Sequence, residues 1–201
     1  MKKMMLLGVL MLGVATTVYA QESRQDVSLS FLGVTAPDVY ALGVFPMHTT
    51  NTGGALASYR YMLTPRSALE LNYSFAQNTI RYHPTSNPGF VHSRQQEITG
   101  AYVYSRTYGN FNPFLEAGIG AMIFTPIIDS GTSAKSVKQN TNIGGLFGGG
   151  VAYEISPSFD IRVEYRGFLL KAPDFGDPFG TWKTNRYYVM SIPAVGVAYH
   201  F

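Results

Sequence analysis

Apolar and polar side chains alternate with a period of two along much of the chain, which is the spacing of a β-strand. The clearest case is residues 159–166, FDIRVEYR, in which the charged side chains share one face and the apolar ones the other. The same period recurs over 69–75 and over 195–201. A helix would spread the charges of 159–166 around its circumference. The pattern therefore predicts an all-β protein.

Eight strands follow from this pattern, and the connections between them alternate in length. The expected strands are 26–33, 53–63, 68–77, 94–106, 111–124, 142–155, 159–170 and 186–201. Three connections are short (64–67, 107–110 and 156–158), and four are long (34–52, 78–93, 125–141 and 171–185). A meander with tight turns at one end and long loops at the other has this order. Outer-membrane barrels combine short periplasmic turns with longer extracellular loops.

One face of every expected strand is almost free of charge, as in Leu69, Leu71, Tyr73 and Phe75 of the strand 68–77. Such a face suits lipid, where an Arg or Lys at the bilayer midplane costs about 2–4 kcal/mol. Tyrosines near the strand ends suit the aromatic girdles of a membrane barrel. A soluble barrel or sandwich is the alternative, but its water-facing side would not be as rich in glycine and alanine as 142–155 and 186–201 are.

Strands that face lipid must close into a ring, because an unpaired edge is prohibitively costly in a bilayer. We therefore expect a closed eight-stranded antiparallel up-and-down transmembrane β-barrel. Pro193 lies inside the last strand and cannot donate a hydrogen bond to the ladder. A β-bulge is expected at that position.

The first twenty residues have the features of a cleaved signal peptide. Lys2 and Lys3 precede an apolar run, and Val18 and Ala20 occupy the small-residue positions of a cleavage site. The expected domains are thus a signal peptide, 1–20, and an outer-membrane barrel, 21–201. The formal charge of +3 and the scattered basic residues do not suggest a nucleic-acid partner. The absence of cysteine from the sequence excludes a disulfide scaffold and a cysteine nucleophile.

The chain resembles the small eight-stranded outer-membrane barrels typified by OmpX and by the transmembrane domain of OmpA. The resemblance rests on the signal peptide, the eight alternating strands, the unequal connections and the ending VGVAYHF over 195–201. It implies that Tyr199 and Phe201 belong to an assembly signal read by the outer-membrane insertion machinery. It also implies a monomer in the outer membrane of a Gram-negative-type bacterium, in contact with lipid and lipopolysaccharide.

Charged residues also fall on the expected inward faces, where an eight-stranded barrel has just enough room for side chains. Enclosed charges must pair, because an unpaired buried charge is costly. We therefore expect a salt-bridge network that plugs the lumen, formed by Arg60, Glu70, Glu97, Glu116, Arg162, Glu164 and Arg166. A small gated channel is the alternative. The carboxylates have no spacing that marks them as a catalytic pair.

Catalysis and metal binding find little support in the sequence. A lipid A deacylase needs a serine within reach of a histidine, and the pairs to consider are His92 with Ser93 and His83 with Ser86. The residues of each pair point to opposite faces if the chain is extended. Residues 83–89 contain two prolines and a glycine, which favour a turn. A turn there would allow His83 and Ser86 to meet, but nothing in the sequence requires it. No enzyme activity, cofactor or metal is therefore expected, with a lipid A-modifying enzyme kept as the alternative.

The long loops are where a surface ligand would bind, since loops on a rigid scaffold often carry function. Loop 34–52 is rich in aliphatic and aromatic residues, and loop 171–185 contains Phe175, Phe179 and Trp182. These side chains either form an interaction surface or pack on one another. We expect a structural or adhesin-like role, with both loops as candidate sites for a partner.

Overall fold

The structure is a computed structural model that describes residues 24–42, 46–82, 89–129, 132, 137–176 and 182–201. The predicted signal peptide, 1–20, lies outside the described residues. Within the described part of the chain, no helix is long and apolar enough to cross a membrane.

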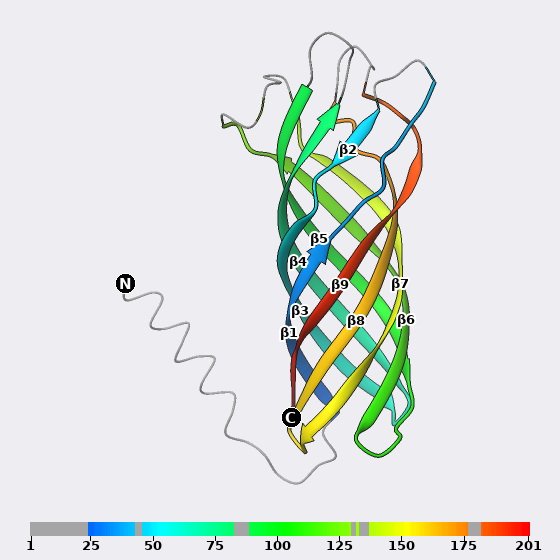
Figure 1. The fold of residues 1–201 in the computed structure, drawn as a ribbon. Helices are drawn as coiled ribbons and strands as arrows, with labels where there is room; N and C mark the ends of the chain where they lie inside the picture. The colour runs from blue at the N-terminus through cyan, green and yellow to red at the C-terminus, as the bar shows by residue number, and fades with distance from the viewer. Residues whose placement is uncertain (1–23, 43–45, 83–88, 130–131, 133–136, 177–181) are drawn as a thin grey trace.

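Eight long strands build the fold, and a ninth, short strand lies in the first long connection (Figure 1). The strands are β1 (Gln25–Val34), β2 (Met47–Thr49), β3 (Thr52–Thr64), β4 (Ser67–Tyr82), β5 (Gly89–Ser105), β6 (Phe111–Pro126), β7 (Asn140–Ser156), β8 (Phe159–Lys171) and β9 (Tyr187–His200). All eight expected strands are present, and β2 was not expected.

The eight long strands close into an antiparallel barrel, as predicted. Their order around the ring is β4-β3-β1-β9-β8-β7-β6-β5, and the pairing of β4 with β5 closes it. Short β2 adds to the free upper part of β4, where Met47 pairs with Tyr82. In Figure 1 the strands are tilted, and the start of β1 and the end of β9 lie at the same end of the barrel as the tight turns.

Side chains alternate between the lumen and the outer surface along each strand. Large outward residues such as Leu71, Leu115 and Ile143 are 58%, 68% and 78% exposed. Their neighbours in sequence, such as Asn72, Glu116 and Asn142, point inward, and the first two are buried. The charge-free faces predicted from the sequence are therefore the outer wall of the barrel.

Two details of the expected strands are wrong. The connection predicted over 78–93 is mostly strand, because β4 continues to Tyr82 and β5 begins at Gly89. Most outward side chains there are polar, as in Thr79, Arg81 and His92, so the sequence pattern resembles that of a loop although the backbone remains paired. At Pro193 no bulge forms, and Pro193 stays in register with Tyr165 of β8. Pairing of β9 with β1 instead stops at Ala194 and resumes at the bridge between Ser191 and Thr35. The backbone nitrogen of Pro193, which carries no hydrogen, therefore faces β1.

Candidate functional site

The lumen near the tight turns is filled by buried charged side chains. Arg60 on β3 lies directly opposite Glu70 on β4, and its Nε donates to Glu70 Oε2 at 2.6 Å. The tight turn that joins β3 to β4 fixes this register. Because both side chains are almost fully buried, the pair joins two adjacent strands inside the lumen.

Arg162 on β8 extends this cluster across the barrel. Its Nη2 lies 3.1 Å from Asp26 Oδ1 on β1, and its Nη1 lies 3.8 Å from Glu70 Oε2 on β4. Its Nη1 also donates to the Ser28 hydroxyl at 3.2 Å. Strand β4 is four places from β8 in the ring of eight. One guanidinium therefore links opposite walls.

Arg166, also on β8, makes a second link across the lumen. Its Nη2 donates to Glu97 Oε1 at 2.8 Å, and its Nε donates to Glu116 Oε1 at 3.3 Å. Glu97 also accepts hydrogen bonds from the hydroxyls of Ser74 and Thr99, each at 3.1 Å. Arg166 thereby joins β8 to β5 and β6.

Carboxylates outnumber arginines in this layer. Three arginines face five carboxylates, namely Asp26, Glu70, Glu97, Glu116 and Glu164. Glu164 is buried, yet it makes no ion pair or hydrogen bond with any described residue. Oε2 of Glu116 is likewise buried without a hydrogen-bond partner. The structure therefore brings six of the seven predicted lumen residues into ion pairs and leaves Glu164 outside them.

Glycines on β7 make room for these side chains. A Cβ at Gly148 would lie 2.7 Å from Glu116 Oε1, and one at Gly150 would lie 2.8 Å from Glu164 Cβ. A larger residue at either glycine would therefore collide with the backbone of β8, and at Gly148 it would also collide with the Glu116 carboxylate. The glycine run 144–150 thus has a packing role in the lumen.

The ring of Phe114 on β6 is buried beneath two guanidiniums. The ring centroid lies 4.8 Å from Cζ of Arg60 and 5.8 Å from Cζ of Arg162. Cation–π contacts of this kind are worth about 0.5–2 kcal/mol. Phe114 therefore interacts favourably with both arginines.

Asp26 and a histidine–aspartate contact at the turn end of the lumen were not predicted from the sequence. Nε2 of His200 on β9 lies 2.9 Å from Oδ2 of Asp160 on β8. Asp26 and Asp160 both occupy inward positions of their strands, so the alternation was a sufficient signal to predict both as lumen residues.

Tyr199 and Phe201, the predicted assembly signal, lie at the end of β9. Their rings are stacked, with centroids 6.0 Å apart.

The loop end of the lumen is mainly apolar, although Asn78, Ser93 and Gln95 are also buried there. This apolar filling was not predicted from the sequence. Its fully buried side chains come from several strands and from the connection after β8, and they include Leu56, Ile80, Phe124, Phe168, Phe175 and Met190. We call this set the apolar layer. The ring of Phe175 meets that of Phe124 edge to face, with centroids 6.4 Å apart.

The described residues of the connection after β8, 172–176 and 182–186, contact the mouth of the barrel. The Trp182 ring stacks on Tyr82 of β4 with centroids 4.5 Å apart, and the Tyr82 hydroxyl donates to the carbonyl of Pro173 at 2.6 Å. Phe175 is fully buried although its φ is +48°. Phe175 and Trp182 therefore pack inward, while Phe179 lies outside the described residues.

The first long connection presents a different surface. Tyr40 is 64% exposed and Leu42 is fully exposed. Val39 and Met47 hold the base of this segment through two backbone hydrogen bonds, of 2.9 and 3.0 Å. Nearby, His48 Nδ1 lies 2.7 Å from Asp38 Oδ1. An exposed aromatic and an exposed leucine thus stand on a hydrogen-bonded base.

The histidines do not form a nucleophile–base pair in the described residues. His92 lies on the outer side of β5 and contacts Asp129 at 2.8 Å, whereas Ser93 is fully buried on the lumen side. His83 and Ser86 lie outside the described residues. Over the ranges that the structure describes, no group of three or more His, Asp or Glu side chains is placed to hold a metal ion.

Known proteins share this barrel architecture. A family model described as "Outer membrane protein beta-barrel domain" matches residues 6–201. No curated protein sequence matches the chain.

Three of the solved structures that are similar to the chain over most of its length illustrate the likeness. Neisserial surface protein A (NspA) has a TM-score of 0.63 and 17% identity, covering 89% of this chain and 98% of that one. OprG from Pseudomonas aeruginosa has a TM-score of 0.60 and 12% identity, covering 90% and 97%. The outer membrane protein AlkL has a TM-score of 0.55 and 13% identity, covering 93% and 94%. At these identities the likeness shows a shared fold.

Proposed function

The chain belongs to the family of outer-membrane protein β-barrel domains, and on that basis we propose that it is a sealed barrel that binds a surface partner through its first extracellular loop. Its place is the outer membrane of a Gram-negative bacterium, where barrels of this kind present long loops to the outside. We propose that it acts as a monomer.

The filling of the lumen supports a sealed barrel. In the periplasmic half, Arg162 and Arg166 are 1% and 0% exposed and reach across the lumen to β4 and β5. In the extracellular half, Phe124, Phe168 and Phe175 of the apolar layer are fully buried. Ions would have to pass both layers in series. A structural or surface role is therefore favoured over a gated channel.

The observation that carries the surface role is the exposure of Tyr40 and Leu42 on an anchored loop. Tyrosine is enriched among the residues that dominate binding energies at protein interfaces. The pairing of Val39 with Met47, and of β2 with β4, fixes the base of the loop before any partner arrives. Such preorganisation lowers the entropic cost of binding. The aromatic side chains of Phe175 and Trp182, by contrast, are engaged in closing the barrel.

Cell adhesion and conductance together test the proposal. Cells that carry the protein should adhere better to cultured epithelial cells or to immobilised matrix proteins than cells without it. The double variant Tyr40→Ala with Leu42→Ala should lose this gain, whereas Tyr108→Ala, an exposed tyrosine at a periplasmic turn, should retain it. Purified protein in planar bilayers should carry no stable current. Equal adhesion with and without the protein would contradict the surface role, and large stable currents would contradict the sealed lumen.

A further inference from the structure

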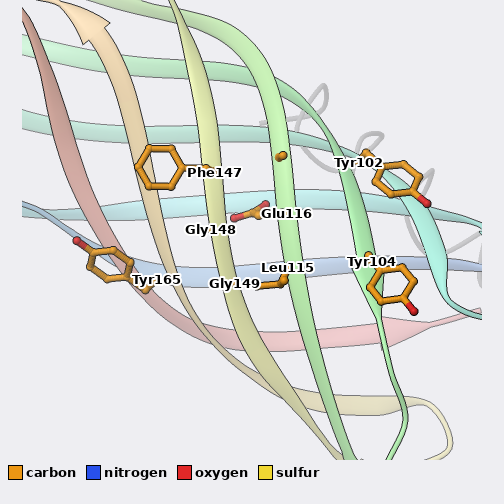
Figure 2. Close-up of a pocket in the computed structure, with 9 residues that line it drawn as sticks. Tyr102, Tyr104, Leu115, Glu116, Phe147, Gly148, Gly149 and Tyr165 are labelled. Carbon is orange, nitrogen blue, oxygen red and sulfur yellow. The ribbon is translucent and has the colours of Figure 1, made fainter.

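A groove of about 530 Å³ runs along the outer wall of the barrel, where the strands face lipid. Figure 2 shows Tyr102 and Tyr104 of β5 on one side and Phe147 and Tyr165 on the other, with Leu115 and Gly149 between them. Its remaining outward lining residue is Ala117. Because the groove faces the hydrocarbon of the membrane, an acyl chain has the chemistry to fill it.

Side-chain packing explains why the groove stays open. The Phe147 ring leans over Gly167 of β8, where a Cβ would lie 2.5 Å from its Cζ. Aromatic cover of a strand glycine is a known way to complete a sheet surface. The ring is thereby held towards β8, on the side away from Tyr102. Ala117, which pairs with both Phe147 and Tyr102, is too small to fill the space between them.

A second hollow, of about 420 Å³, lies at the periplasmic rim beside this groove. Pro65, Arg66, Arg106, Thr107 and Tyr108 line it. The N–H of Arg106 donates to the carbonyl of Pro113, which places Arg106 two residues, or about 7 Å, below the level of Leu115. The hollow therefore lies where lipid headgroups meet the lower end of the groove.

Neither arginine of this hollow is neutralised within the described part of the chain. Arg66 and Arg106 are exposed and have no carboxylate within 4.0 Å. The Arg106 Nε donates instead to the Tyr104 hydroxyl at 3.3 Å, so it is drawn towards the groove. Guanidinium groups match phosphate oxygens in shape and charge, often through paired hydrogen bonds.

We propose that the groove and the hollow together form a binding site for one glycerophospholipid of the periplasmic leaflet. Its phosphate binds between Arg66 and Arg106, and one acyl chain lies against Leu115 and Gly149. Tyr104 joins the two parts, because it lines the groove and accepts the hydrogen bond from Arg106. This inference does not depend on the extracellular role proposed above.

Native mass spectrometry of the purified full-length protein, released from detergent micelles, tests the site. Three probes are added separately: palmitoyl-oleoyl phosphatidylglycerol, the diacylglycerol with the same chains, and inorganic phosphate. We expect one phosphatidylglycerol to be retained and neither of the other two probes. Retention of diacylglycerol to the same extent would refute the phosphate contact, and equal binding of inorganic phosphate would refute the role of the acyl chain.

Paired variants separate the site from general effects of charge and bulk. The double variant Arg66→Gln with Arg106→Gln should weaken phosphatidylglycerol retention about tenfold or more, since it removes two charge-assisted contacts. Arg81→Gln with Arg94→Gln removes two exposed arginines at the other end of the barrel and should leave retention unchanged. Ala117→Phe should fill the groove and displace the lipid, whereas Ala57→Phe, at an exposed outward position of β3, should not. Unchanged retention in the Arg66/Arg106 variant would overturn the proposal.

Discussion

Arg166 on β8 and Glu97 on β5 meet across the lumen, with Nη2 and Oε1 2.8 Å apart. Two other strands, β6 and β7, separate them along the wall. Both side chains are essentially inaccessible to solvent. Glu97 also accepts hydrogen bonds from the hydroxyls of Ser74 and Thr99. A buried pair with satisfied hydrogen bonds is costly to break, because the remaining partner keeps an uncompensated charge. The pair therefore fixes the distance between non-adjacent strands.

Removal of Arg166 should destabilise the barrel strongly. Arg166→Met leaves Glu97 and Glu116 without their cation, and breaking a buried pair in this way costs about 3–5 kcal/mol. Urea unfolding of the protein in lipid vesicles, followed by the mobility shift of the folded barrel in gels, measures the change. Glu164→Gln is the matched control, since Glu164 has no ion-pair or hydrogen-bond partner among the described residues. Its free energy of unfolding should change by less than about 1 kcal/mol, and equal losses in both variants would contradict the assigned pairing.

Trimming the apolar layer alone should not create a channel. Phe124→Ala with Phe175→Ala removes two rings from the extracellular half of the lumen. The charged layer below, with Arg162 and Arg166 extended across the barrel, remains in place. Planar-bilayer recordings of this variant should therefore match those of the unchanged protein. A stable current through the double variant would show that the apolar layer is the only barrier to ions.

Strand alternation was enough to predict the barrel and the inward position of each lumen charge. The same alternation predicts an inward position for Asp26, which precedes the outward Val27 on the same strand. It does not predict the contacts across the lumen, such as Arg162 with Glu70, because these depend on the stagger between distant strands. Among lumen residues, only neighbours such as Arg60 and Glu70, joined by a tight turn, have a register that the local sequence sets.

The apolar layer shows a second limit of the sequence pattern. Phe124, Phe168 and Met190 alternate with outward residues that are also apolar, so periodicity alone does not distinguish lumen from lipid there. The burial of Phe175 depends on the backbone path of residues 172–176, which follow β8. That path includes a left-handed backbone conformation at Phe175 itself, with φ +48°, which the sequence does not signal.

The contact between Tyr82 and Trp182 should be visible by fluorescence, because the sequence contains a single tryptophan. Tyr82→Ala removes the ring stacked on Trp182, so water should reach the indole and its emission should shift to longer wavelength. Tyr82→Phe keeps the ring but loses the hydrogen bond to Pro173, and should cost about 0.5–1.5 kcal/mol with little spectral change. Tyr187→Ala, an exposed outward tyrosine of β9, serves as the control. An unshifted spectrum in Tyr82→Ala would mean that Trp182 does not pack on β4.

The C-terminal residue should matter more for assembly in the cell than for stability. Phe201 is 41% exposed, and its contacts are a backbone hydrogen bond to Gln25 and ring stacking on Tyr199. Deletion of Phe201 thus removes no side chain from the lumen, and the free energy of unfolding in vesicles should change by less than about 1 kcal/mol. If the terminal phenylalanine is read by the insertion machinery, the same deletion should sharply lower the amount of folded protein in outer-membrane fractions. Tyr153→Ala, which alters an outward aromatic residue of β7 away from the terminus, should not reproduce this defect. Normal outer-membrane levels of the deletion variant would show that Phe201 is not part of the assembly signal.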